Sequence, residues 1–143
     1  MNVVDSSAWL EYFGDGPNAS EFAPAIENLD DLVVPVLTIF EVFKRTHQIA
    51  DETAALEAAA VMMQGRVVDL GATLALDAAR LSLDTGLALA DSIILATTRA
   101  EDAVLWTQDA HFDGLKGVEF RPKLSRLSAP ANKGVVVSGA VRN

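Results

Sequence analysis

Cysteine is absent from this chain of 143 residues, and histidine occurs only twice. Without thiols the protein forms no disulfide and no thiolate metal site, which favours a cytoplasmic location. No apolar run reaches the roughly 18–20 residues that a helix needs to cross a bilayer, so we expect no membrane span. The first residues also lack the basic flank and cleavage site of a secretory signal. These absences indicate a globular protein, and the length suits one domain with a single core.

Basic residues are scarce over most of the chain. Residues 1–113 contain 19 acids and five bases, whereas residues 114–143 contain six bases and one acid. The acidic body disfavours a protein that coats nucleic acids, because such proteins neutralise phosphates with Lys and Arg. The imbalance is compatible with an acidic domain that binds cations and a basic C-terminal segment that binds polyanions. The alternative is that these charges are only solvated surface groups.

Short apolar segments alternate with amphipathic ones along residues 1–120. Strands are predicted at 1–4, 32–35, 66–70, 103–107 and 118–120. Helices are predicted at about 7–14, 18–29, 38–44, 51–63, 71–86 and 88–100. Strands separated by helices pair in parallel through crossovers. We therefore predict an α/β fold, a three-layer α/β/α sandwich with a central, mostly parallel sheet of four to five strands.

The last part of the chain differs in composition from the rest. Residues 1–127 are predicted to form the domain, and residues 128–143 to form a C-terminal tail. Pro, Asn and Gly residues flank the run Val135-Val136-Val137. This composition predicts either a flexible tail or a strand that pairs with a partner.

Four acids stand where the chain leaves the C-terminal edge of the predicted sheet: Asp5, Glu41, Asp91 and Asp109. In open α/β sheets, ligand sites lie just outside these strand ends. Four carboxylates gathered there raise one another's pKa unless a cation neutralises them. Mg²⁺ or Mn²⁺ suits such an all-oxygen site. Zinc is not expected, because neither His47 nor His111 has metal-ligand spacing to another histidine.

Each acid also has a purely structural explanation. Asp5 ends a strand where a helix cap is common, although Ser6 or Ser7 can cap that helix instead. Thr38 and Glu41 have the spacing of a capping box. Capping or the helix dipole explains the other two acids in the same way. The common position of all four acids favours a metal site over four separate explanations.

Four motifs, in family order, resemble PIN domains, and within them the VapC toxins of VapBC toxin–antitoxin pairs. They are Val3-Val4-Asp5-Ser6-Ser7, Val33-Val34-Pro35 with Glu41 and Lys44-Arg45, the segment GLALADSIILAT at 86–97, and LWTQDAHF at 105–112. The resemblance covers residues 1 to about 127. The acidic net charge and the extension after residue 128 depart from the usual pattern of that family.

The resemblance implies a metal-dependent endoribonuclease that acts as the toxin of a type II toxin–antitoxin pair. It would hydrolyse RNA phosphodiester bonds with Mg²⁺, for which Mn²⁺ can substitute. The implied catalytic acids are Asp5, Glu41, Asp91 and Asp109, of which Asp5, Asp91 and Asp109 are metal ligands. Ser7 and Thr107 are implied as supporting hydroxyls, and Asp113 is a candidate fifth acid.

Several partners follow from the same resemblance. They are a single-stranded or looped RNA, a small antitoxin that inserts its C-terminal segment near the acids, and a second copy in a homodimer. The candidate RNA contacts are Lys44, Arg45 and Arg99, for which helix-surface salt bridges are an equally good explanation. Three phenylalanines are candidates for an interface or groove but are expected in the core: Phe13, Phe40 and Phe43.

Two other functions stay open at this point. An RNA-processing PIN nuclease without a toxin role would carry the same site, and an upstream antitoxin gene would separate the two. A non-catalytic, receiver-like module that binds Mg²⁺ is also compatible with clustered acids. Against it, no lysine follows a late strand where such a module needs an ammonium group.

Overall fold

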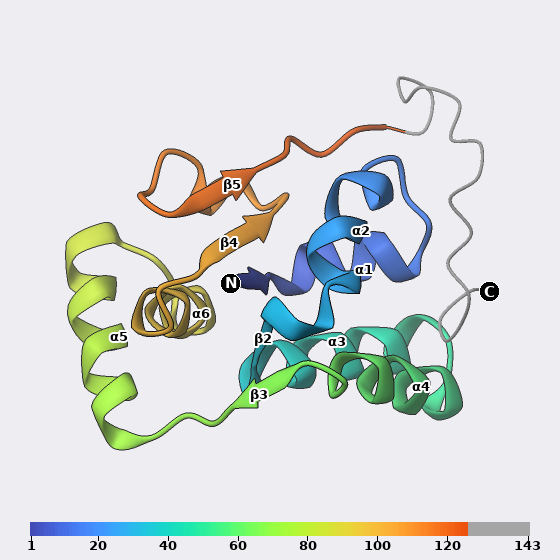
Figure 1. Cartoon of the computed structure of the whole chain (residues 1–143), viewed down its shortest axis with the longest axis horizontal. Helices are drawn as coiled ribbons and strands as arrows, with labels where there is room; N and C mark the ends of the chain where they lie inside the picture. The colour runs from blue at the N-terminus through green and yellow to red at the C-terminus, as the bar shows by residue number, and fades with distance from the viewer. Residues whose placement is uncertain (126–143) are drawn as a thin grey trace.

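A parallel sheet organises residues 1–125, which are the residues that the computed structural model describes (Figure 1). Its strands are β1 (Asn2–Val4), β2 (Leu32–Pro35), β3 (Arg66–Val68), β4 (Val104–Thr107) and β5 (Val118–Phe120). They lie in the order β3-β2-β1-β4-β5, and each neighbouring pair is parallel. The predicted α/β class and parallel sheet are confirmed. The predicted tail at 128–143 lies outside the described residues.

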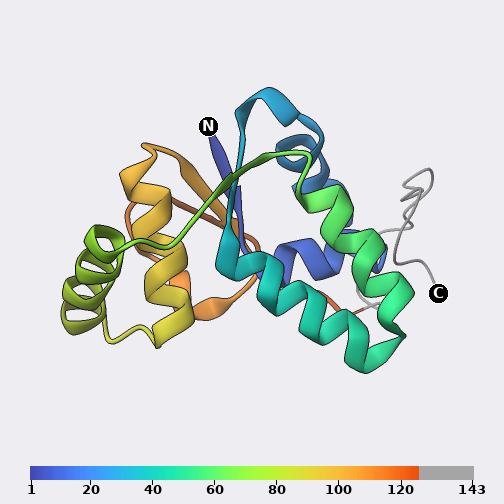
Figure 2. The same ribbon diagram turned by 90° about the horizontal axis from the view of Figure 1, so that it is seen from below.

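Helices cover both faces of the sheet. They are α1 (Ser6–Phe13), α2 (Ala19–Glu27), α3 (Val36–Ile49), α4 (Glu52–Met62), α5 (Ala72–Thr85) and α6 (Leu89–Ala100), with short 3₁₀ turns η1 (Leu29–Asp31) and η2 (Ala110–Phe112). Figure 2 shows α5 and α6 on one side of the strands and α1, α3 and α4 on the other. This arrangement is the predicted three-layer sandwich.

The two cores follow from the two-residue period of the strands. Successive side chains of a strand point to opposite faces, so a strand covered on both faces is apolar throughout. On one face, Val4 belongs to the buried cluster that contains Trp9 of α1. On the other face, Val3 belongs to the buried cluster that contains Ile94 of α6. Both valines are fully buried, which fixes β1 at the centre of the molecule.

Some apolar residues lie elsewhere than the sequence indicates. Leu29, predicted in the buried stripe of the second helix, is 44% exposed, because α2 ends at Glu27. Phe13 is buried as expected, but Phe40 is 60% exposed, and Phe43 is only partly buried. The core prediction was therefore wrong for Phe40, whose neighbour Val42 occupies the buried face of α3 instead.

The helices α5 and α6 pack against each other at a steep angle beside the sheet (Figure 1). Gly86 ends α5 with φ of 77°, a left-handed conformation that favours glycine. The turn delivers the first residues of α6 to the C-terminal edge of the sheet. Between residues 1 and 125, no single helix is long and apolar enough to cross a bilayer, and α5 and α6 pass that test only as a pair bent by 113°.

Candidate metal centre

Asp5 follows β1 directly and is the most deeply buried acid of the site, with 2% of its surface exposed. Two hydroxyl groups hold its carboxylate. Ser7 Oγ donates a hydrogen bond of 2.7 Å to Asp5 Oδ2, and Thr107 Oγ1 donates one of 2.9 Å to the same oxygen. The Thr107 hydroxyl also accepts a hydrogen bond of 2.9 Å from the backbone N–H of Asp109. The ends of the adjacent strands β1 and β4 are thereby connected.

Asp5 also caps α1, which corrects the prediction that Ser6 or Ser7 does so. The helix begins at Ser6, so both serines lie in its first turn and neither occupies the cap position. The Asp5 carboxylate accepts the backbone N–H of Ser7 at 3.4 Å. The side chain of Ser7 instead donates to the carboxylate, which leaves Asp5 as both a cap and a member of the site.

Glu41 lies in the second turn of α3, and the capping box predicted for it does not form. The helix begins at Val36, so Thr38 is already helical, and its hydroxyl donates to the Pro35 carbonyl at 2.7 Å. Glu41 Oε1 is buried and has no hydrogen-bond partner among residues 1–125. A buried carboxylate oxygen without a donor is costly unless a cation meets it.

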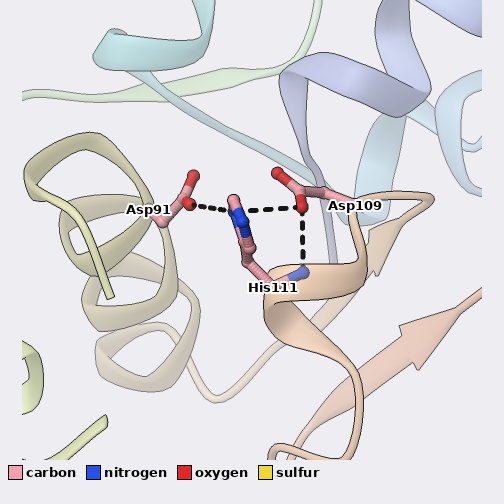
Figure 3. A group of neighbouring side chains, drawn as sticks. All are labelled: Asp91, Asp109 and His111. Atoms are coloured by element: carbon pink, nitrogen blue, oxygen red, sulfur yellow. Dashed lines mark hydrogen bonds and ion pairs between the residues drawn. The ribbon is translucent and has the colours of Figure 1, made fainter. Parts of the chain in front are cut away.

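Asp91 and Asp109 face each other across the side chain of His111 (Figure 3). Asp91 lies in the first turn of α6, and Asp109 caps η2 by accepting the backbone N–H of His111 at 2.9 Å. The imidazole Nδ1 lies 3.6 Å from Asp91 Oδ2 and 3.3 Å from Asp109 Oδ1. One ligand atom from each of these residues lies within 4.8 Å of the others.

The charges of neighbouring acids contribute to the raised pKa values of Asp5, Glu41 and Asp91. Burial raises the pKa of Asp5, Ser7 and Thr107 oppose the rise by hydrogen bonding, and Asp109 adds to it. Burial also raises the pKa of Glu41, and the charges of the other three acids raise it further. The pKa of Asp91 is raised by burial and then by Asp5 and Asp109, while His111 lowers it. Mutual repulsion of this kind is expected where carboxylates lie close to one another.

His111 is the residue that the sequence reasoning missed. A search for histidines spaced to bind a metal together finds none, because the partners of His111 are two aspartates. The sequence does contain one indication that His111 belongs to the site. It lies two residues after Asp109, so the same turn presents both side chains. Its side chain is 75% exposed, so it lies at the mouth of the site, whereas Asp5 lies at the bottom.

The other predicted site residues separate into two groups. Lys44 and Arg45 lie on α3 beside Glu41, where all three line one hollow. Asp113 ends η2 and is exposed, and it is not among the charges that raise the pKa of the clustered acids. Arg99 lies near the far end of α6, about 12 Å along the helix from Asp91. The structure thus brings neither Asp113 nor Arg99 into the cluster.

The predicted salt bridges do not explain the two cations on α3. Within residues 1–125 neither Lys44 nor Arg45 forms an ion pair, even with Glu41 at helical spacing from both. Arg99 donates to the backbone carbonyl of Lys116 at 3.2 Å.

A buried amide network supports the loop between β4 and η2. Asn18 Nδ2 donates to Gln108 Oε1 at 3.1 Å and to the Pro122 carbonyl at 2.9 Å. The backbone N–H of Gln108 donates a hydrogen bond of 3.3 Å to Ser7 Oγ. Because Gln108 precedes Asp109, this network fixes the backbone that presents one of the clustered acids.

The donor set fits a hard divalent cation. It consists of carboxylate oxygens with one imidazole at the rim, and Mg²⁺ and Mn²⁺ accept such ligands. The unpartnered Glu41 Oε1 and the raised pKa values of Asp5, Glu41 and Asp91 are the features that a bound cation would relieve.

The PIN domain family model matches residues 3–118. The chain belongs to the PIN domain family. This membership agrees with the resemblance seen in the four motifs and gives no support to a receiver-like module. No curated protein sequence matches the chain.

Solved structures of toxin–antitoxin proteins share this PIN fold. A toxin–antitoxin complex from Klebsiella pneumoniae is similar, with a TM-score of 0.69 and 19% identity over 87% of this chain and 100% of that chain. The sarcin–ricin-loop-cleaving toxin VapC20 of Mycobacterium tuberculosis has a TM-score of 0.71 and 20% identity over 85% and 100%. DNA-bound VapBC from Salmonella typhimurium has a TM-score of 0.65 and 13% identity over 85% and 97%.

Proposed function

We propose that this PIN protein is a metal-dependent endoribonuclease of the VapC type. The observation that carries the proposal is the group of four acids at the C-terminal edge of the sheet, with one buried oxygen of Glu41 left without a hydrogen-bond partner. Clustered like charges destabilise a fold unless a bound cation compensates them, and such clusters therefore often mark a functional site.

Asp5, Asp91 and Asp109 are the proposed metal ligands, with Glu41 as the fourth acid of the site. When bound, Mg²⁺ or Mn²⁺ lowers the pKa of water and stabilises negative charge at a phosphate. Ser7 and Thr107 keep the Asp5 carboxylate in one orientation by hydrogen bonding. Groups held in this way need no reorganisation during the reaction, which is how a site of fixed charges lowers a barrier.

His111 occupies the exposed mouth of the site. Its imidazole lies within 3.6 Å of both Asp91 and Asp109, so it fits a rim ligand or a group that contacts the substrate phosphate. A single exposed histidine does not form an acid–base pair with a second one. We therefore propose that water, and not the 2′-hydroxyl of the RNA, attacks the phosphorus.

The chemistry of the product ends tests this mechanism. Purified protein is incubated with single-stranded RNA in the presence of Mg²⁺, Mn²⁺ or a chelator, and the new ends are identified. We expect cleavage only with the divalent ion, and fragments without a 2′,3′-cyclic phosphate. Cyclic phosphate ends, or equal cleavage in the presence of the chelator, would contradict the mechanism.

A toxin role with a small antitoxin partner is the second part of the proposal. It is supported by the family and by the structural neighbours, which include toxin–antitoxin complexes and a toxin. Expression of the chain alone should arrest growth, and co-expression of a small gene immediately upstream of its own should restore it. An Asp5→Asn chain should not arrest growth. Normal growth with the unmodified, soluble chain would indicate RNA processing without toxicity.

We also propose a homodimer. Three leucines on α5 and α6 are strongly exposed, and together they give these helices an apolar outer surface: Leu76, Leu83 and Leu89. Sedimentation of the purified chain should give the mass of two copies, and Leu83→Asp should give one.

A further inference from the structure

One face of α3 presents an exposed ring and two exposed cations directly beside the acids. Phe40, Lys44 and Gln48 are four residues apart in succession, so their side chains lie in one row on the helix. With Arg45 and Glu41 they line a hollow of about 300 Å³, which Ser6 and Leu10 of α1 close on the other side. Glu41 therefore belongs both to this hollow and to the metal centre.

The chemistry of this hollow differs from that of the rest of the surface. Phe40 is 60% exposed, whereas Thr38, Val42 and Thr46 form the buried face of its helix. Lys44 Nζ lies 5.9 Å from the centre of the Phe40 ring. Residues 1–113 contain only five bases, and two of them, Lys44 and Arg45, stand here together. Within the described residues neither is paired with an acid, whereas Arg66 and Arg80 form ion pairs.

An aromatic face flanked by free cations matches one nucleotide of a single strand. Bases stack on exposed aromatic rings, and Lys and Arg bind the adjoining phosphates. A duplex does not present such a base, because its bases are stacked on one another. An acidic peptide would match the cations but would leave the ring without a partner. A second copy of the chain would also cover Phe40 but would place two equal sets of cations against each other.

We propose that this surface, formed by Phe40, Lys44, Arg45 and Gln48, is a nucleotide-binding subsite that holds single-stranded RNA next to the bond to be cut. Phe40 stacks on an unstacked base, and Lys44 and Arg45 bind the phosphates on its two sides. Gln48, one turn further along α3, offers an amide that can donate to and accept from a base edge. The inference rests on the proposed function, since it takes RNA as the substrate.

The subsite gives an acidic enzyme a way to hold a polyanion. The four acids repel the RNA backbone at the point of cleavage, and the pair of cations on α3 provides attraction at the neighbouring phosphates. Stacking adds an attraction that does not depend on charge. Affinity for RNA should therefore depend on the presence of bases and fall only modestly with salt. The logarithm of the binding constant should fall with the logarithm of the salt concentration, with a slope of about 0.7 for each phosphate that is neutralised.

Binding of two short oligomers tests the proposal. An Asp91→Asn chain serves as the background, because reduced cleavage leaves the RNA intact. Affinity is measured by fluorescence anisotropy for a single-stranded oligoadenylate and for an abasic ribose-phosphate chain of the same length. We expect Phe40→Ala to weaken oligoadenylate binding by about 5- to 150-fold and to leave the abasic oligomer unaffected. Phe40→Trp should restore binding, because it keeps an aromatic face.

Two control variants separate this effect from general changes in the surface. Leu56→Ala removes another apolar side chain, 55% exposed on α4, and should not change affinity. Lys44→Ala should weaken binding of both oligomers and reduce the salt slope, whereas Lys116→Ala should do neither, because Lys116 precedes β5 at the opposite edge of the sheet.

The outcomes distinguish the subsite from its alternatives. Equal affinity of Phe40→Ala and its parent for oligoadenylate would overturn the inference, and so would an equal loss for both oligomers. A change of sedimentation in Phe40→Ala would assign the ring to a contact between copies and would also overturn it. Phe40-dependent binding, together with an unmodified chain that cleaves no RNA, would support the subsite and contradict the proposed nuclease. Cleavage by the unmodified chain without Phe40-dependent binding would support the nuclease and contradict the subsite.

Discussion

Thr107 Oγ1 donates a hydrogen bond of 2.9 Å to Asp5 Oδ2, although 102 positions separate the two residues in the sequence. The bond joins the C-terminal ends of β1 and β4, and the same hydroxyl accepts the backbone N–H of Asp109. One threonine thus fixes two of the clustered acids relative to each other.

Removal of this hydroxyl should weaken metal binding. Thr107→Val keeps the shape of the side chain but leaves Asp5 with one donor fewer and the backbone N–H of Asp109 without its hydroxyl acceptor. We expect Mn²⁺ affinity to fall by about 10- to 100-fold, as it does when hydrogen bonds to metal ligands are lost. Isothermal titration measures it. Thr97→Val is the matched control, because its equally buried hydroxyl donates only to the Ile93 carbonyl within α6. Equal affinity of the two variants would contradict the role of Thr107.

The stability of the metal-free protein should fall as the pH rises. The pKa values of Asp5, Glu41 and Asp91 are raised above their ordinary 3.8 for Asp and 4.5 for Glu, so the folded state holds its protons more tightly than the unfolded state does. The stabilisation is complete below the ordinary values and is lost as the pH rises through the folded ones. Urea denaturation between about pH 4 and pH 7 measures this trend. Saturating Mn²⁺ should oppose the loss, and an identical pH trend with and without Mn²⁺ would contradict the metal site.

Neutralising one of these acids should stabilise the metal-free fold. Asp91→Asn removes a charge that Asp5 and Asp109 repel, and we expect a gain of about 0.5–2 kcal/mol in the free energy of unfolding. The same change should remove most of the rise in melting temperature that Mn²⁺ causes in the parent protein. Asp69→Asn, at an exposed position between β3 and α5, alters the net charge equally and should do neither. A destabilised Asp91→Asn protein that still responds to Mn²⁺ would argue against the cluster.

Asn18 should be important for folding without touching the acids. Asn18→Ala removes the donor of two hydrogen bonds and leaves the Gln108 side chain and the Pro122 carbonyl without it. Because Asn18 is only 4% exposed, we expect a loss of about 1–3 kcal/mol in the free energy of unfolding. Asn28→Ala loses one bond to Asp31 at the surface and should change stability by less than about 0.5 kcal/mol.

The sequence predicts the sheet well, because its strands are short apolar runs between amphipathic helices. Val3 and Val4 are both apolar and both buried, as a central parallel strand requires. The position of the acids at strand ends was also predictable, since parallel strands share one C-terminal edge. These predictions depend on local pattern and on one rule of topology.

Contacts between distant segments were not predictable. The exposure of Phe40 depends on which face of α3 meets the core, and a helix with apolar residues on several sides does not reveal that face. His111 joins the site only because α6 and the turn after β4 approach each other. The cap of α1 was predicted wrongly because Asp5, Ser6 and Ser7 are all good caps, and only the end of β1 decides among them.

Cleavage of RNA by single carboxamide variants tests the central claim most directly. The rates of Asp5→Asn, Glu41→Gln, Asp91→Asn and Asp109→Asn are compared with that of the parent on one single-stranded RNA with Mn²⁺, and circular dichroism confirms that each is folded. We expect each to lose at least about 100-fold in rate, while Asp113→Asn, an exposed acid outside the cluster, stays within about twofold of the parent. Parental rates in the four folded variants, or a loss in Asp113→Asn as large as theirs, would contradict the four-acid metal centre.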